Sequence, residues 1–223
     1  MKYKYYIALG LMAGLLCFKP AIGQKNKGID DPDAKYGGFS IIQSNNGAGF
    51  GGFYEYAINA SNRLTANIHL LIVRGKNDYP IYNPYDPYGY TYERADKTRL
   101  SFIPVLVGYK RILFVDKLAN NFRPYLQFDG GPVIALDPAN VPDFSDRMKN
   151  MEVYYTGIFR VGAGMDFATT PRTLISVFLG YEYLKFANKI DLPYELPEEP
   201  DKYYTGRKDF TGITIKVSIG KKF

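Results

Sequence analysis

The last fourteen residues alternate between apolar and polar side chains with a strict period of two. One side carries Thr211, Ile213, Ile215, Val217 and Ile219, and the other carries Gly212, Thr214, Lys216, Ser218 and Gly220. Successive side chains of a β-strand point to opposite faces, so this pattern predicts a strand with one apolar and one polar face. The segment ends on the aromatic Phe223. A strand that faces lipid on one side and a polar lumen on the other accounts for both features.

Seven earlier segments alternate in a similar way and are separated by turn signals. The eight predicted strands are residues 36–44, 48–58, 64–74, 99–113, 122–136, 155–169, 174–188 and 210–223. Most are long enough to cross a hydrocarbon layer as tilted strands, which takes about 9–11 residues. Pro104 lies inside the fourth segment and cannot donate a ladder hydrogen bond, so we expect a bulge there.

The connections between these segments alternate in length. The short ones are residues 59–63, 114–121 and 170–173, and the long ones are 75–98, 137–154 and 189–209. The first join, around Asn45-Asn46-Gly47, is also short, and an Asn-Gly pair favours a tight hairpin. In an up-and-down barrel this rhythm places the three long loops at one end, as in bacterial outer-membrane barrels. The sequence therefore predicts an all-β fold, an eight-stranded antiparallel up-and-down transmembrane β-barrel over residues 36–223.

The N-terminus has the features of a cleaved export signal over residues 1–23. Lys2 and Lys4 precede an apolar run at residues 7–17, and the small residues Ala21 and Gly23 mark a cleavage site. Residues 24–35 are polar and predict a flexible lead-in. Removing the signal lowers the formal net charge from +6 to +3, so the charge gives no reason to expect a nucleic-acid partner.

The remaining composition favours an outer-membrane location. No apolar stretch long enough for a spanning helix follows the signal, whereas the chain is rich in Tyr (21), Phe (15) and Gly (22). A soluble lipocalin-like barrel is the structural alternative, and it would require an apolar interior and a polar exterior.

The alternation also predicts which charged side chains point into the barrel. These are Glu55, Asp129, Arg160, Asp166, Glu182 and Lys216. Charges in a narrow interior should pair, because an unpaired buried charge is costly. We interpret them as a structural polar network. A narrow ion path is the alternative, although eight strands leave little room beyond their own side chains.

No residue pattern indicates catalysis, a cofactor or a metal site. His69, the single histidine, points into the predicted lumen, and no nucleophile elbow, metalloprotease or phosphate-loop motif is present. A lipid-modifying enzyme stays a formal alternative. The acidic, proline-rich residues 192–201 predict a solvated loop, and their spacing defines no cation site.

The first long loop contains tyrosines at intervals of three with prolines between them. Tyr79, Tyr82, Tyr85 and Tyr88 would form one stripe on a polyproline-type helix, and Tyr90 and Tyr92 would extend it. Tyrosine offers broad contact area and a hydroxyl group, as binding surfaces require. We interpret the stripe either as a binding surface for a protein or glycan or as an interfacial or self-packed collar.

Three segments, GIFRVGAGMDF at residues 157–167, IPVLVGY at 103–109 and the terminal strand, resemble the small outer-membrane β-barrel family typified by OmpX and the OmpA transmembrane domain. The resemblance implies that Ile215, Val217, Ile219 and Phe223 form an assembly signal for the barrel-insertion machinery. Lys221 departs from that pattern, because an apolar or aromatic residue is usual there.

These observations predict a non-enzymatic barrel in the bacterial outer membrane, in contact with membrane lipid and lipopolysaccharide. Its external loops would serve adhesion, partner binding or envelope integrity, with an extracellular or membrane protein as a candidate partner. The alternative is an accessory barrel subunit of an outer-membrane secretion or transport complex.

Overall fold

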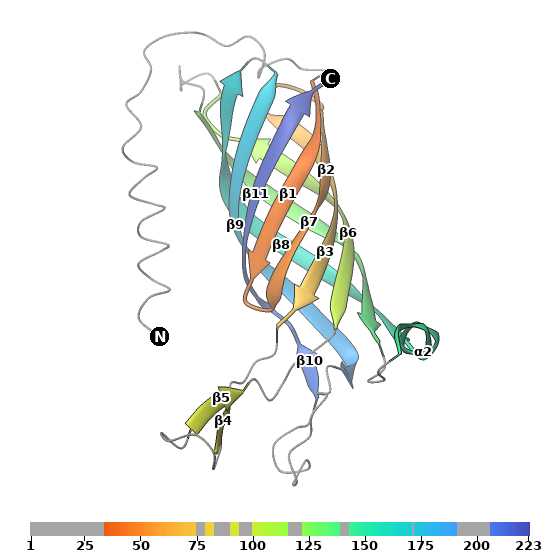
Figure 1. The fold of residues 1–223 in the computed structure, drawn as a ribbon. Coiled ribbons are helices and arrows are strands. Elements are labelled where there is room, and N and C mark those ends of the chain that lie inside the picture. Colours follow the sequence, from red (N-terminus) through yellow and green to blue (C-terminus); the bar gives the residue numbers. More distant parts are fainter. Residues whose placement is uncertain are drawn as a thin grey trace.

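The computed structural model describes residues 34–74, 79–82, 90–93, 100–115, 122–138, 143–170, 172–190 and 206–223. Eight long strands make up the barrel (Figure 1). They are β1 (Lys35–Ser44), β2 (Gly47–Ala57), β3 (Asn62–Val73), β6 (Ser101–Ile112), β7 (Phe122–Asp137), β8 (Glu152–Thr170), β9 (Thr173–Ile190) and β11 (Gly212–Lys222). All eight predicted segments are confirmed as strands, with ends that differ by a few residues.

The strands form one closed antiparallel sheet. Their order is β9-β11-β1-β2-β3-β6-β7-β8, and a further β8–β9 pairing closes the ring. The predicted closure of the last strand against the first is confirmed by the continuous pairing from Tyr36 opposite Lys222 to Ser44 opposite Thr214. Both ends of the described barrel chain lie at the same end of the cylinder as the short β2–β3 and β8–β9 turns (Figure 1).

The opposite end carries the three long connections, as predicted. Within the described residues they contain a hairpin of β4 (Tyr79–Tyr82) and β5 (Tyr90–Glu93), the short helix α2 (Phe144–Lys149) and β10 (Arg207–Asp209), which pairs with β9. The Asp143 side chain caps α2 by accepting a hydrogen bond from the Asp146 amide. The strands β7, β8 and β9 are the longest of the barrel and extend beyond the other strands at this end.

The β4–β5 hairpin corrects the polyproline-type conformation expected for the first loop. Tyr79 and Tyr82 lie on β4 and pair with Glu93 and Tyr90 on β5, so the chain doubles back on itself here. The three-residue repeat predicts one extended helix only if no cross-strand hydrogen bonds are available, and the hairpin supplies them. Tyr85 and Tyr88 lie outside the described residues, as do residues 1–33 with the predicted signal and nearly all of the lead-in.

The bulge expected at Pro104 is also wrong. The pairing of β3 with β6 keeps one register on both sides of the proline, from Ile68 opposite Val105 to Leu71 opposite Phe102. The ladder is interrupted only at two neighbouring positions, where His69 and Leu70 would stand opposite Pro104 and Ile103. A missing N–H therefore costs the sheet local pairing here without adding a residue to the strand.

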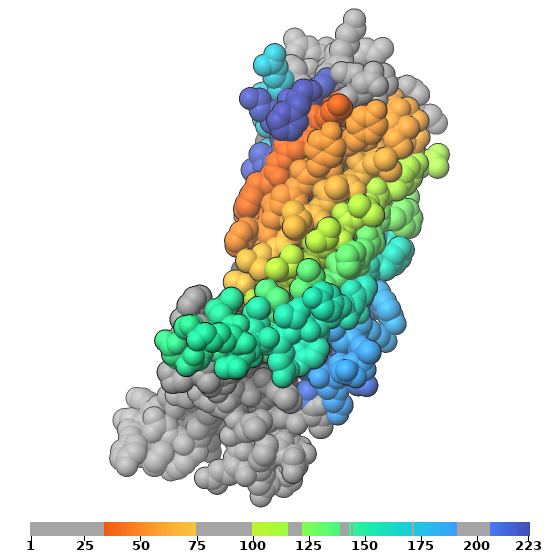
Figure 2. Space-filling view, turned by 90° about the vertical axis from the view of Figure 1, so that its right-hand side faces the viewer, coloured from red at the N-terminus to blue at the C-terminus, as the bar shows by residue number. Residues whose placement is uncertain are grey.

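The two faces of the wall follow the predicted alternation. Along β3 the burial pattern alternates residue by residue, with Ile68 and Ile72 exposed outside and Asn67 and His69 buried inside. The space-filling view shows the strands crossing the side of the barrel as tilted bands, from β1 in orange to β8 in teal (Figure 2). This tilt lets a ring of eight strands close around an interior that side chains can fill.

Candidate functional site

The interior contains the charged side chains predicted to lie there. Glu55, Asp129, Arg160, Asp166, Glu182 and Lys216 are all buried, with at most 5% of their surface exposed. They come from β2, β7, β8, β9 and β11, so the barrel brings together residues that are far apart in the sequence. The inward placement predicted from alternation is thereby confirmed for the whole set.

Four of the interior charges form one compact cluster. The Lys110 ammonium lies 2.9 Å from Oε1 of Glu55 and 2.8 Å from Oδ2 of Asp166. The Arg63 Nη1 atom approaches the same two carboxylates, at 3.2 Å from Glu55 and 3.5 Å from Asp166. Each of the two cations thus contacts both anions, and the four residues come from β2, β3, β6 and β8.

Aromatic rings cover this four-charge cluster. The Lys110 ammonium lies 4.0 Å from the centre of the Tyr125 ring, and the Arg63 guanidinium lies 4.9 Å from the centre of the Tyr36 ring. Cations bind the faces of such rings, most strongly when they are desolvated. The Tyr125 hydroxyl in turn bonds Ser176 Oγ at 2.8 Å, which links the cluster to β9.

The other interior charges have separate partners. Arg160 pairs with Glu182 at 3.1 Å. Asp129 accepts hydrogen bonds from Thr65 Oγ1 at 3.0 Å and from Gln127 Nε2 at 2.9 and 2.8 Å.

Lys216 differs from these residues. Its ammonium donates to Asn67 Oδ1 at 3.1 Å and lies 5.6 Å from the Phe178 ring centre, and no carboxylate of the described chain lies within 4 Å of it.

Sequence reasoning missed three of the buried bases. Arg63, Lys110 and Arg123 are also buried, so five bases face four acids among the described interior residues. The alternation predicts that β3 begins at residue 64, which places Arg63 in the preceding turn, whereas the strand begins at Asn62. The parity of β6 and β7 was obscured by their prolines, although counting back from Asp129 on β7 would have placed Arg123 inside.

The position of His69 is as predicted, inside the barrel on β3. Its Nε2 lies 2.9 Å from Ser40 Oγ, and both residues are buried. A serine–histidine pair needs an acid on the other ring nitrogen and access for a substrate. Nδ1 of His69 has no hydrogen-bond partner in the described chain, so the geometry favours a packed polar pair over a catalytic dyad.

The half of the interior near the long loops is apolar. A buried cluster there includes Phe102, Phe186 and Phe210, whose rings meet at 5.0–5.6 Å, with both contacts of Phe210 edge-to-face. The further members of this loop-end apolar cluster are Ile42, Leu71, Val73, Leu100, Leu106, Val133, Ala135, Ile158, Leu184 and Ile190. The predicted polar network therefore fills only part of the interior, and the sequence pattern did not indicate this apolar cluster.

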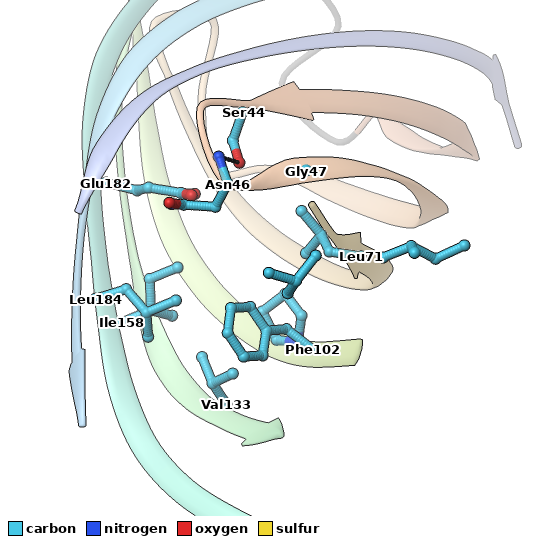
Figure 3. A pocket seen from close by; sticks show the side chains of 12 residues that line it. Ser44, Asn46, Gly47, Leu71, Phe102, Val133, Ile158, Glu182 and Leu184 are labelled. Carbon is cyan, nitrogen blue, oxygen red and sulfur yellow. Dashed lines mark hydrogen bonds between the residues drawn. The ribbon is translucent and has the colours of Figure 1, made fainter. Parts of the chain in front are cut away.

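A small cavity lies where the polar and apolar parts meet (Figure 3). Asn46, at the β1–β2 turn, and Glu182, on β9, point toward one another, and Phe102, Ile158 and Leu184 line the apolar side. Its volume is about 10 Å³, which is about the room that one water molecule needs. An organic ligand does not fit.

The terminal strand presents one apolar row on the outside of the barrel. Ile215, Val217 and Ile219 are exposed in one outward row of β11, and the Phe223 ring is 80% exposed. The Phe223 amide bonds the Lys35 carbonyl at 3.0 Å, which continues the pairing with β1. A Cβ atom on Gly37 would lie 2.9 Å from the Phe223 ring, so the glycine leaves room for this aromatic residue.

The described residues at the long-loop end form no metal site and include exposed polar pairs. In the described part of the chain, no group of three or more His, Cys, Asp or Glu residues could hold a metal ion. None of the described helices is long and apolar enough to cross a membrane. Two exposed pairs order this end: Lys185 with Asp209 at 3.3 Å, and Tyr154, whose hydroxyl donates to Glu152. The bond to Glu152 raises the pKa of Tyr154 to about 12.

The chain is similar to several solved barrel structures. Neisserial surface protein A is 12% identical, with 85% of this chain and 94% of that chain covered and a TM-score of 0.49. The outer membrane protein OprG of Pseudomonas aeruginosa is 11% identical, covers 87% and 98%, and has a TM-score of 0.45. The N-terminal β-barrel domain of OprF from the same organism is 10% identical, covers 86% and 98%, and has a TM-score of 0.44.

No family model and no curated protein sequence matches the chain. With identities near one in ten and TM-scores below 0.5, we take the fold from the closed strand pairing of the chain itself.

Proposed function

We propose that this chain is an integral protein of a bacterial outer membrane, without enzyme activity, whose barrel anchors external loops for adhesion or partner binding. The main support is the inversion of polarity across the wall. Val107, Ile72 and Ile41 are 59–69% exposed on the outside, whereas Lys110, Arg160 and Asp166 are fully buried inside. Exposure of such an apolar exterior to water is unfavourable, whereas contact with a hydrocarbon layer is favourable.

The same inversion argues against the lipocalin-like alternative, which needs polar outward rows. An open sheet would leave backbone groups unpaired in lipid, and the closed β8–β9 pairing avoids that.

Cell fractionation tests the location. We expect the protein in the outer-membrane fraction, resistant to urea extraction, and migrating faster on a denaturing gel before boiling than after it. Recovery in the soluble periplasmic fraction would contradict the proposal.

Loop deletions test the external role. Deletion of residues 78–92 removes the β4–β5 hairpin, and deletion of residues 191–205 removes an equal length from the third loop as a matched control. Both variants should keep the heat-modifiable barrel. Cells with the first deletion should adhere less to surfaces coated with glycans or matrix proteins, and equal adhesion of both variants and the full chain would remove this hairpin from the proposal.

A further inference from the structure

Basic side chains end the outward rows at the short-turn end of the barrel. Along β11, the exposed row of Ile215, Val217 and Ile219 continues with exposed Lys221. The corresponding row of β1 ends with exposed Lys35. In each row the base is the terminal outward residue: Lys221 is the next outward residue after Ile219 on β11, and Lys35 is the next after Gly37 on β1.

A third base joins them through strand pairing. Lys221 stands opposite Gly37 on β1 and opposite Thr173 on β9, and exposed Arg172 directly precedes Thr173. We call Lys35, Arg172 and Lys221 the turn-end basic cluster, because they occupy the same end of three neighbouring strands.

Among the described residues, the turn-end basic cluster has no acidic partner. Within the described residues, no carboxylate side chain lies within 4.0 Å of any of its three charged groups. At the loop end, in contrast, Lys185 pairs with Asp209 and Lys149 pairs with Asp146.

The position of the cluster identifies the anion that would bind it. Basic side chains just beyond a lipid-facing row extend their charged ends to the level of the phospholipid headgroups. The Lys35 ammonium also lies 5.9 Å from the ring centre of outward-facing Tyr56, and such tyrosines are characteristic of this interface. Three cations at this depth attract phosphate groups, most strongly in lipids with a net negative charge.

We propose that the turn-end basic cluster binds the phosphate groups of anionic phospholipids in the leaflet next to the short turns. This inference rests on the proposed membrane location. It also gives Lys221 a role at the position where the terminal strand departs from an apolar assembly signal.

Tryptophan quenching can test this directly, because the chain contains no native tryptophan. Ile219→Trp places a probe beside the cluster, and Ile213→Trp places a matched probe in the same outward row of β11 at the loop end. Each protein is refolded into vesicles that contain brominated phosphatidylglycerol or brominated phosphatidylcholine. The first probe should show a roughly fivefold preference for the anionic lipid, and the second should show none.

Charge removal completes the test. Lys35→Gln with Arg172→Gln leaves β11 untouched and should reduce the preference at the Ile219→Trp probe, and adding Lys221→Gln should abolish it. Raised salt should weaken it. As a control, Lys149→Gln with Lys185→Gln should change nothing. Equal quenching by both lipids at both probes would overturn the inference and leave the membrane location intact, whereas no quenching by either lipid would contradict the proposed function itself.

Discussion

The two halves of the barrel interior are held together by different physics. Toward the short turns, Arg63 and Lys110 each contact both Glu55 and Asp166 at 2.8–3.5 Å. Toward the long loops, the rings of Phe102, Phe186 and Phe210 pack with aliphatic side chains.

The contribution of an interior residue to stability therefore depends on the half of the barrel in which it lies. In the charged half, each side chain is tolerated because of its partners, and removing one leaves another buried charge uncompensated. In the apolar half, each side chain contributes through the area and volume that it fills. A second substitution can therefore restore lost stability more readily in the charged half than in the apolar half.

The largest expected effect is that of Lys110→Met. It leaves Glu55 and Asp166 with Arg63 as their shared cation, and we expect a loss of about 3–5 kcal/mol in the free energy of unfolding. Guanidinium unfolding in phospholipid vesicles measures it. Adding Glu55→Gln should recover much of the loss, and a double variant as unstable as the single one would contradict the charge-balance explanation.

Phe210→Ala should lower the free energy of unfolding by about 3 kcal/mol, because the ring is fully buried between Phe102 and Phe186. The same unfolding measurement applies, with Phe210→Leu as the control that keeps most of the volume. Neutralising a charged residue elsewhere in the interior should not restore stability. Rescue by such a change would mean that the two halves are not distinct.

Gly108→Ala tests the border of the charged half, and we expect it to lower the free energy of unfolding by about 1–3 kcal/mol. A Cβ atom there would lie 2.1 Å from Asp129 Oδ1 and 2.4 Å from the Phe128 carbonyl oxygen, so the backbone or the carboxylate must move. Gly157→Ala is the matched control, since its Cβ atom would meet only the Gly131 carbonyl oxygen, at 3.9 Å. Equal melting temperatures of the two variants would count against this packing.

The smallest effect concerns the exposed Lys185–Asp209 pair, which joins β9 to β10 outside both halves. Hydrogen bonds from Thr211, assisted by Lys185, lower the pKa of Asp209 from 3.8 to about 2. A lowered pKa stabilises the folded form above the ordinary value, and this contribution is lost as the pH falls through 3.8 toward 2.

Protection of the β10 amides against exchange, measured relative to the intrinsic exchange rate at each pH, should therefore fall over that interval, and in Asp209→Asn it should not change there. Titration of Asp209 at 3.8 or above by NMR would contradict the assignment.

Much of the fold could be predicted because the relevant signal is local. Period-two alternation identified the strands and placed Glu55, Arg160 and Lys216 inside without knowledge of their partners. The pattern was weakest on β6 and β7, where Pro104 and Pro132 interrupt it. That is where Lys110 and Arg123 were missed and a bulge was wrongly expected.

The sequence by itself determined the number of barrel strands, the inward and outward faces of all strands except β6 and β7, and the end that carries the long loops, because these follow from alternation and chain length between turns. Only the tertiary structure decided that Lys110 bridges Glu55 and Asp166, that the loop-end interior is apolar and that Lys35, Arg172 and Lys221 share one rim. These features depend on register and closure between strands far apart in the chain, which no local pattern encodes.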